Sequence, residues 1–232
     1  MRKWMSGVPI AGAYALSAAA YARLAPEAQP DFSPLLPVRI AAEGPVPRVA
    51  VAFLIPTIAL GVWLLLAFAV RVRGPVKGIP EWWLNEKSGA ASISRFEPTY
   101  ETILFSVAAL FLLMHAVFVA ASLGASSWIY QVATIILGLG FIAVGNVMPR
   151  VRPNWIVGLR TKRTLSDSSA WTMTHRLLGA LMIAAGAIVI ILSIVAPRYA
   201  LISSLVTLLL AFVFAHLFGT RAADARAKTD PA

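Results

Sequence analysis

Long apolar runs constrain this chain more than any other feature. The hydrocarbon core of a bilayer is about 30 Å thick, so a helix that crosses it needs about 20 mostly apolar residues. Inside lipid every backbone amide must be hydrogen-bonded within its own segment or to neighbouring strands, which helices and closed barrels achieve. The sequence therefore predicts an all-α fold, a polytopic membrane bundle of six transmembrane helices. The six predicted spans are residues 4–24, 49–70, 102–123, 128–148, 174–196 and 200–219.

Charge placement predicts how these helices are oriented. The chain is 59% hydrophobic and 13% charged, and it carries 20 Lys and Arg residues with a formal net charge of +10. Such a charge could suggest nucleic acid, but the bases lie at the ends of the apolar runs. With the N-terminus inside, 16 of the 20 fall on inner segments. The positive-inside rule then predicts an N-in/C-in protein whose partner is the lipid bilayer, with no direct nucleic-acid contact.

The first run has a second interpretation. Its start, "MRK" before an Ala-rich stretch with "SAAAYA", is also typical of a signal peptide with a small-residue cleavage site. We favour retention because Arg2 and Lys3 fit the orientation of everything downstream. Ala11, Gly12, Ala15 and Ala19 would then let this helix pack closely inside the bundle.

The loops divide the predicted spans into units. Residues 25–48 hold six prolines and are not expected to form a helix. We predict an N-terminal two-helix membrane domain (1–73) with this Pro-rich extracytoplasmic loop, a cytoplasmic linker (74–101), a four-helix membrane domain (102–220) and a cytoplasmic tail (221–232).

The polar stretch 145–176, "GNVMPRVRPNWIVGLRTKRTLSDSSAWTMTHR", stands between two of the apolar runs. Gly145 and Asn146 are predicted to cap the fourth span, and Pro149 and Pro153 to prevent the helix from resuming. Thr164 stands three residues before Asp167, the spacing of a capping box, with Ser166 as an alternative cap. A helix over 167–196 would follow.

The start of that helix gathers polar and aromatic residues. Trp171, His175 and Leu178 share one face at helical spacing, and Thr172, Arg176 and Gly179 share the next. Gly179 and Gly186 would let another helix approach closely. Each residue taken alone could serve only topology, the membrane interface or the turn. Topology requires only charge, however, so the interleaved Asn, Gly, Thr and His indicate a folded surface.

The residues of this polar stretch resemble the signature of a known protein family. The pattern "GNVMPRVRPNWIVGLRTKRTL...W..THR...G" resembles the signature of the SdpI family of bacterial membrane proteins, over roughly residues 130–196. Lys162 and Arg163 stand where members of the family commonly have Pro and an aromatic residue. The matching positions are Gly145, Asn146, Pro149, Pro153, Asn154, Gly158, Arg160, Thr161, Thr164, Leu165, Trp171, His175, Arg176 and Gly179.

The N-terminal part is more weakly similar to a small two-helix domain of unknown function that often precedes this family region. The similar stretch is "LLPVRIAAEGPVPR" followed by "VAFLIPTIALGVWLLL". Ala41, Ala42 and Glu43 stand where that domain usually has a His and a longer polar run. The departure puts in doubt any outer binding role that the motif carries.

The resemblance implies an integral membrane immunity or signalling protein of the bacterial cytoplasmic (inner) membrane. It would protect the cell from a secreted membrane-active peptide toxin and could sequester a cytoplasmic repressor. The alternative is a membrane carrier or lipid-handling protein that binds an anionic headgroup at the inner leaflet. A third reading is a lipid enzyme with His175 as general base. The predicted binding and motif residues are Asn146, Pro149, Asn154, Gly158, Arg160, Thr161, Trp171, His175 and Arg176.

Specific roles follow for some of these residues. The Asn and Thr side chains are expected to brace the loop by hydrogen bonds, Arg160 to clamp an anion or a helix C-terminus, and Trp171 to anchor at the membrane interface.

Other chemistry has little support in the sequence. There is no cysteine, and the three histidines lack the spacing of a zinc site, so we predict no metal, no cofactor and no catalytic residue. His115 and His216 fall within predicted spans, where a neutral histidine hydrogen-bonded to a neighbouring helix is the simpler interpretation. All acidic residues fall in loops or at span edges, which disfavours a proton-coupled transporter.

Overall fold

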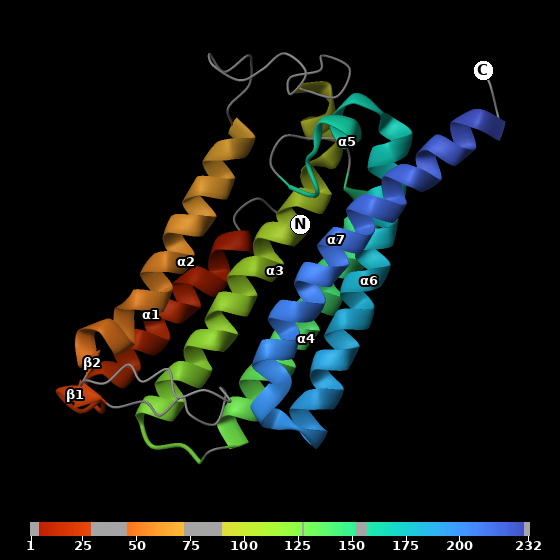
Figure 1. Cartoon of the computed structure of the whole chain (residues 1–232). Helices are drawn as coiled ribbons and strands as arrows, with labels where there is room; N and C mark the ends of the chain where they lie inside the picture. Colours follow the sequence, from red (N-terminus) through yellow and green to blue (C-terminus); the bar gives the residue numbers. More distant parts are fainter. Residues whose placement is uncertain (1–4, 29–45, 72–89, 127, 152–156, 230–232) are drawn as a thin grey trace.

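The structure, a computed structural model, describes residues 5–28, 46–71, 90–126, 128–151 and 157–229. They form a helical bundle with a two-stranded antiparallel bridge at one end (Figure 1). The elements in chain order are η1 (Met5–Gly7), α1 (Val8–Tyr21), β1 (Glu27–Ala28), β2 (Val46–Pro47), α2 (Arg48–Arg71), α3 (Ala90–Ser122), α4 (Trp128–Val147), η4 (Met148–Arg150), α5 (Lys162–Ser166), α6 (Ser168–Val195) and α7 (Pro197–Thr229).

The fold class predicted from the apolar runs is confirmed. Five helices in the described residues are long and apolar enough to cross a membrane: Arg48–Phe68, Thr99–Ser122, Trp128–Arg150, Ser168–Val195 and Pro197–Ala222. The first predicted span corresponds to α1, which has 14 residues and is preceded by the short η1. The count of six spans and the N-in/C-in orientation stay predictions.

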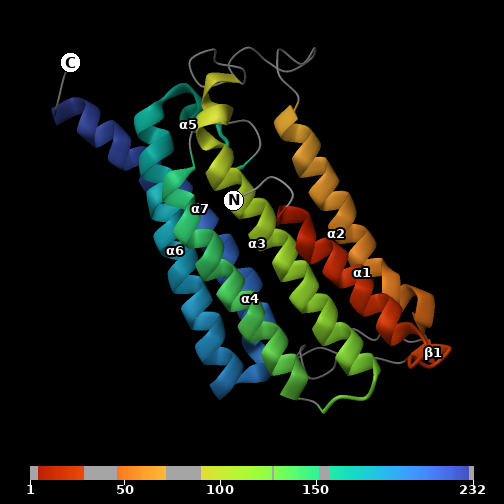
Figure 2. The same ribbon diagram turned by 180° about the vertical axis from the view of Figure 1, so that it is seen from behind.

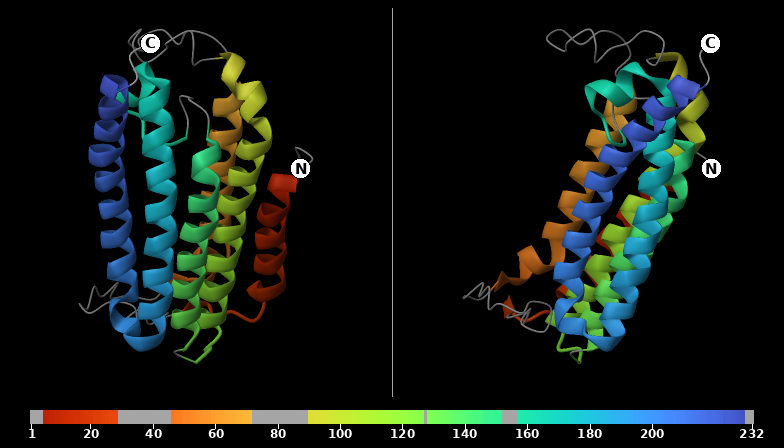
Figure 3. Two further views of the ribbon diagram at one scale, coloured as in Figure 1. Left: turned by 90° about the vertical axis from the view of Figure 1, so that its right-hand side faces the viewer. Right: turned by 45° about the vertical axis from the view of Figure 1, so that its right-hand side comes forward.

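The long helices lie side by side and alternate in direction. Figure 3 shows α7, α6, α4, α3 and α1 in sequence across the bundle with α2 behind them. Figure 2, seen from behind Figure 1, shows α1 and α2 on one side of α3 and α4, α6 and α7 on the other. The ends of α2, α4 and α7 and the starts of α3 and α6 meet at one end, which also carries α5. We call this the α5 end; it corresponds to the predicted inner side.

Glycines set the spacing between α4 and α6. A Cβ atom built on Gly145 would lie 2.8 Å from the carbonyl oxygen of Gly179, and one on Gly179 would lie 2.6 Å from that of Gly145. Gly138 and Gly186 face each other in the same way. The close approach expected at Gly179 and Gly186 is therefore confirmed. Gly145 is not a cap, because α4 continues to Val147 and its glycine serves this contact instead.

Two further sequence expectations are wrong. Helix α1 packs on α2 and α3, and a Cβ on Gly12 would lie 3.5 Å from Leu112 Cδ2 of α3. Ala11, Ala15 and Ala19 are exposed, however, and the buried face contains Ala13 and Ser17. Side-chain size did not decide which face packs, since this helix is apolar all round. The other error concerns the caps near residue 164, described with the site below.

Two connections between the helices can be compared with the sequence analysis where the structure describes them. The α3–α4 connection is a tight turn in which Gly124 adopts φ +86° and Ala125 N–H donates to Ala120 O. The Pro-rich segment enters and leaves through β1 and β2, and residues 29–45 lie outside the described residues. The linker prediction at 74–101 differs in one respect, because α3 already begins at Ala90.

We expect Gly186→Ala to destabilise the bundle and Gly61→Ala to leave it unchanged or slightly more stable. A Cβ on Gly186 would overlap the Gly138 carbonyl oxygen and lie 2.8 Å from Ile142 Cγ1, whereas nothing lies within 4 Å of one on Gly61. Overpacking costs about 1–3 kcal/mol, and Ala is the better helix former. Thermal unfolding in detergent micelles, followed by circular dichroism, measures both. Equal melting temperatures would contradict the glycine contact.

Candidate functional site

The α5 end is built around the side chains of Trp171 and His175 on the first turns of α6. Their rings are stacked with centroids 4.0 Å apart, and each residue is 1% exposed. Residues four apart lie one above the other on a helix, which is why the two rings meet. The predicted shared face of Trp171, His175 and Leu178 is confirmed, since all three are buried.

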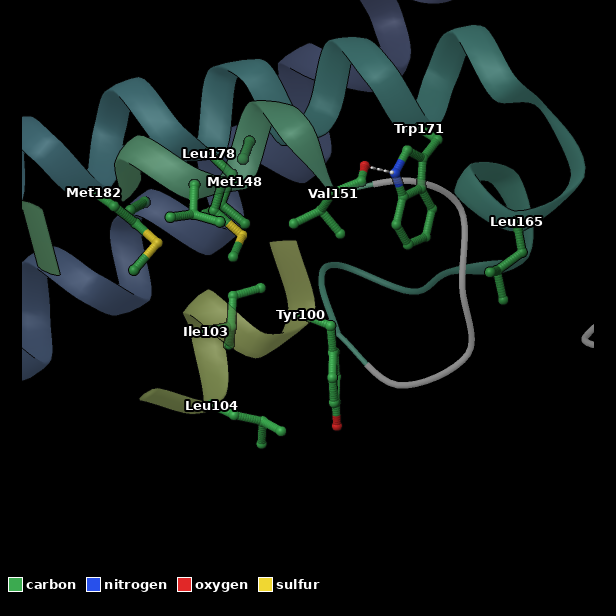
Figure 4. Close-up of a cluster of buried hydrophobic side chains, with 12 residues drawn as sticks. Tyr100, Ile103, Leu104, Met148, Val151, Leu165, Trp171, Leu178 and Met182 are labelled. Carbon is green, nitrogen blue, oxygen red and sulfur yellow. Dashed lines mark hydrogen bonds between the residues drawn. The ribbon is translucent and has the colours of Figure 1, made fainter. Parts of the chain in front are cut away.

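Each of the two rings holds one end of the loop that joins η4 to α5. Trp171 Nε1 donates a hydrogen bond of 2.8 Å to the carbonyl oxygen of Val151, where the loop begins (Figure 4). His175 Nε2 accepts one of 3.0 Å from the backbone N–H of Leu159, near its end. We call Val151, Leu159, Trp171 and His175 the clasp. Residues 152–156, which include the predicted Asn154, lie outside the described residues.

These bonds assign the protonation of His175. Its Nε2 accepts from the Leu159 N–H, so the proton must be on Nδ1, which donates to Trp171 O over 2.8 Å. The ring is neutral in this arrangement. Both nitrogens are engaged and the ring is buried, which leaves no free lone pair for a general base.

Gly158 makes room for the His175 ring. It adopts φ +111°, a conformation that L side chains rarely take, and a Cβ there would overlap His175 Nε2. Any side chain at this position would therefore meet both backbone strain and the ring. This predicted site residue thus lies beside the clasp and makes room for it by its lack of a side chain.

Thr161 and Thr164 build the helix that follows the loop. Thr164 N–H donates to Thr161 Oγ1 and Thr161 N–H donates to Thr164 Oγ1, which makes a capping box at the start of α5. Thr164 is 1% exposed, and its hydroxyl lies 2.8 Å from Leu159 O. Thr161 thus makes hydrogen bonds of the predicted kind, and its role in binding stays a prediction.

The predicted capping box of Thr164 with Asp167 is wrong. The spacing fitted, but the chain forms a separate short helix between the two residues. Asp167 is itself the N-cap of α6, where its Oδ1 accepts from Ser169 N–H over 2.8 Å. Its other oxygen pairs with Arg163 at 3.2 Å. The predicted start of this helix near residue 167 is confirmed.

Trp171 does not anchor at the membrane interface as predicted. A belt residue would keep one edge exposed, whereas this ring lies within an apolar cluster from α3, α4, η4, α5, α6 and α7. The cluster, most of which Figure 4 labels, comprises Tyr100, Ile103, Leu104, Val147, Met148, Val151, Leu165, Trp171, Leu178, Met182, Ala211 and Ala215. The sequence could have indicated this from the shared face with Leu178.

The remaining predicted residues lie outside the clasp. Asn146 is exposed, and its backbone oxygen, rather than its side chain, accepts from Arg150 at 3.4 Å. Pro149 lies in η4 and packs close to Gly179 of α6, where an added Cβ would lie 2.9 Å from its Cδ. Arg160 and Arg176 are exposed at the same end. Protein atoms around Arg160 partly desolvate its guanidinium and lower its pKa, although arginine stays charged at any physiological pH.

Sequence reasoning missed two members of the clasp. Val151 and Leu159 contribute through backbone atoms, which carry no side-chain signal. Gly158 was the available hint, since a Gly between two apolar residues often marks a turn that needs positive φ.

The fold and this site define a multi-pass integral membrane protein with an internally bonded loop at one end of its bundle. Residues 150–220 match the family model described as the SdpI/YfhL protein family. The chain is also 33% identical over 87 residues to "Immunity protein SdpI" of Bacillus subtilis (strain 168), which covers 36% of this chain and 42% of that protein. No solved structure matches.

These matches support assignment of the chain to the SdpI family, as its motif indicated. The chain spans 42% of the length of the Bacillus relative through this match. The residues that match the family model contain the whole clasp, from Val151 to His175. The weaker resemblance of the N-terminal helices to a separate two-helix domain stays a prediction.

We expect Gly158→Ala to cost more stability than Gly124→Ala. Both glycines have positive φ, and placing Ala in that region costs about 1–2 kcal/mol. Only Gly158 also contacts a buried ring, since nothing lies within 4 Å of a Cβ on Gly124. Melting temperatures of the two variants measure the difference. A smaller loss for Gly158→Ala would show that the loop does not rest on His175.

Trp171→Phe is expected to destabilise the protein by about 1–3 kcal/mol, the cost of leaving a buried polar group unpaired. The change keeps an aromatic ring beside His175 but leaves the Val151 carbonyl oxygen without its donor. Trp128→Phe is the matched control, because Trp128 is 58% exposed. Chemical denaturation of the two variants in micelles gives the comparison, and equal stabilities would rule out the indole bond as a tether.

Proposed function

We propose that this chain is a membrane immunity protein, in which the loop held by the clasp is a recognition surface on the cytoplasmic side. The observation that carries the proposal is the clasp itself, which lies within the residues that match the SdpI/YfhL family model. A loop that only satisfied topology would need no buried histidine and tryptophan bonded to its two ends.

The exposed groups around the clasp suit recognition of a soluble partner. Arg160, Lys162 and Arg176 are exposed at the same end as the clasp, while the clasp side chains are buried. A rigid base with charged groups around it lowers the entropy lost on binding. A cytoplasmic repressor, as the family resemblance implies, is the partner that we propose for this surface, and a secreted peptide toxin is the proposed ligand of the opposite end.

The ligand must favour one of two arrangements for such a protein to signal. In this proposal the two arrangements are the bonded clasp and a released one. In the bonded state the Val151 carbonyl oxygen and the Leu159 N–H are both satisfied by α6. Release would expose these groups and the two rings to water.

The test is survival of a toxin-sensitive bacterial host that expresses the chain and is challenged with the cognate membrane-active peptide. We expect the wild-type chain to protect, and His175→Leu to lower protection at least tenfold in viable count, because the loop loses its Leu159 tether. Gly61→Ala should protect as well as wild type. Membrane levels of each variant are measured by immunoblot. Equal killing with and without the wild-type chain would end the immunity proposal.

The exposed basic residues favour a second candidate function, that of a carrier or lipid-handling protein that binds an anionic headgroup. A basic residue near an anionic membrane surface contributes about 1 kcal/mol, and Arg150, Arg160, Lys162 and Arg176 are all exposed at the α5 end. This reading predicts that an anionic phospholipid copurifies at fixed stoichiometry and is lost in Arg160→Ala, as native mass spectrometry would show. Immunity without any bound lipid would favour the first proposal.

A further inference from the structure

A proline inside α2 leaves one backbone carbonyl without its usual partner. Pro56 lies within Arg48–Arg71 and has no N–H, so it cannot donate to the carbonyl oxygen of Ala52, four residues earlier. Both residues are buried. An unpaired carbonyl that is fully buried in the protein is costly, because no water reaches it to replace the missing donor.

A hydroxyl from another helix lies at this carbonyl. Ser17 on α1 is fully buried, and its Oγ lies 2.5 Å from Ala52 O and 2.9 Å from Ala13 O on its own helix. A serine in a helix commonly bonds its own i−4 carbonyl. Here the same hydroxyl also reaches the one carbonyl of α2 that Pro56 deprives of its donor.

A histidine from a third helix completes the arrangement. His115 on α3 is fully buried, and its Nε2 lies 2.9 Å from Ser17 Oγ. Because Ser17 uses its single proton toward a carbonyl, the Nε2 proton of a neutral His115 donates to Ser17 Oγ. The bond confirms the expectation that His115 is bonded to a neighbouring helix. Three helices therefore meet at one hydroxyl group.

A second polar contact joins α2 to α3 nearer the α5 end. Tyr100 OH donates to Leu66 O over 2.6 Å. Ala52 and Leu66 are about 21 Å apart along α2, and Tyr100 and His115 about 22 Å apart along α3, at 1.5 Å per residue. The two contacts therefore match in spacing, and axial sliding of α2 would break both. Tyr100 also belongs to the cluster that contains Val151 and Trp171 of the clasp.

We propose that Pro56, Ser17 and His115 form a polar joint that fixes the axial position of α2 on α3, and thereby supports the clasp through Tyr100. The joint is a conformational device within the membrane bundle. It links β2, which leads directly into α2, with the loop at the opposite end. The proposal rests on contacts in the bundle and does not require the immunity function.

Hydrogen–deuterium exchange of the purified chain in detergent micelles tests the joint. The readout is the peptide that contains the Leu159 N–H, which His175 protects. We expect Ser17→Ala to speed its exchange at least threefold. Ser193→Ala is the matched control, because Ser193 is equally buried but bonds only its own helix at Val189 O in the described structure, and it should leave the exchange unchanged.

A second set of variants tests the role of Pro56. Pro56→Ala restores the N–H that Ala52 O lacks, so Ser17→Ala in that background should speed exchange less than twofold. Non-additivity of this kind is what direct contact produces. If Ser17→Ala alone fails to fold, the Pro56→Ala/Ser17→Ala double variant must fold. Unchanged exchange in Ser17→Ala, equal effects in both backgrounds, or loss of folding in both variants would each overturn the proposal.

Discussion

The close contact between α4 and α6 is the constraint on which the rest of the α5 end depends. Four glycines let the two backbones approach until the carbonyl of one helix lies against the Cα of the other, at Gly145 with Gly179 and at Gly138 with Gly186. In lipid there is little hydrophobic gain from bringing helices together, so such packing contributes much of their association. The contact places the end of α4, where the loop starts at Val151, beside the start of α6.

That proximity explains how the loop can be held by hydrogen bonds from buried side chains. Both tethers run from side chains of α6 to backbone atoms of the loop, and both lie among apolar residues. A hydrogen bond is stronger where water is excluded, and its loss is correspondingly costly. A neutral His175 suits this role because its two nitrogens can donate in one direction and accept in the other. A Lys or Arg could only donate.

The sequence predicts the helices well because nearly every residue of an apolar run is hydrophobic, so the signal is repeated along the whole helix. The sequence predicts less well which face of a helix is buried and at which residue a helix ends. Ala11, Ala15 and Ala19 read as a packing stripe, yet α1 is apolar nearly all round and buries the face that contains Ser17. Gly145 read as a helix end because a capping glycine and a packing glycine look alike in sequence. Trp171 read as an interface anchor because its partner, the Val151 carbonyl, is a backbone atom. Pairings with backbone depend on tertiary position and leave no trace in residue identity.

The same reasoning explains why polar residues are kept within these membrane helices at all. Ser17 and His115 would be costly if each were alone in the bilayer, and Pro56 would leave a carbonyl unpaired. Together they satisfy most of one another's hydrogen-bonding needs, and the arrangement exists only when α1, α2 and α3 are in register. Apolar packing tolerates small axial shifts, whereas a hydroxyl between a carbonyl and an imidazole does not. Polar contacts at two heights on α2 therefore specify a position that hydrophobic side chains alone would leave undetermined.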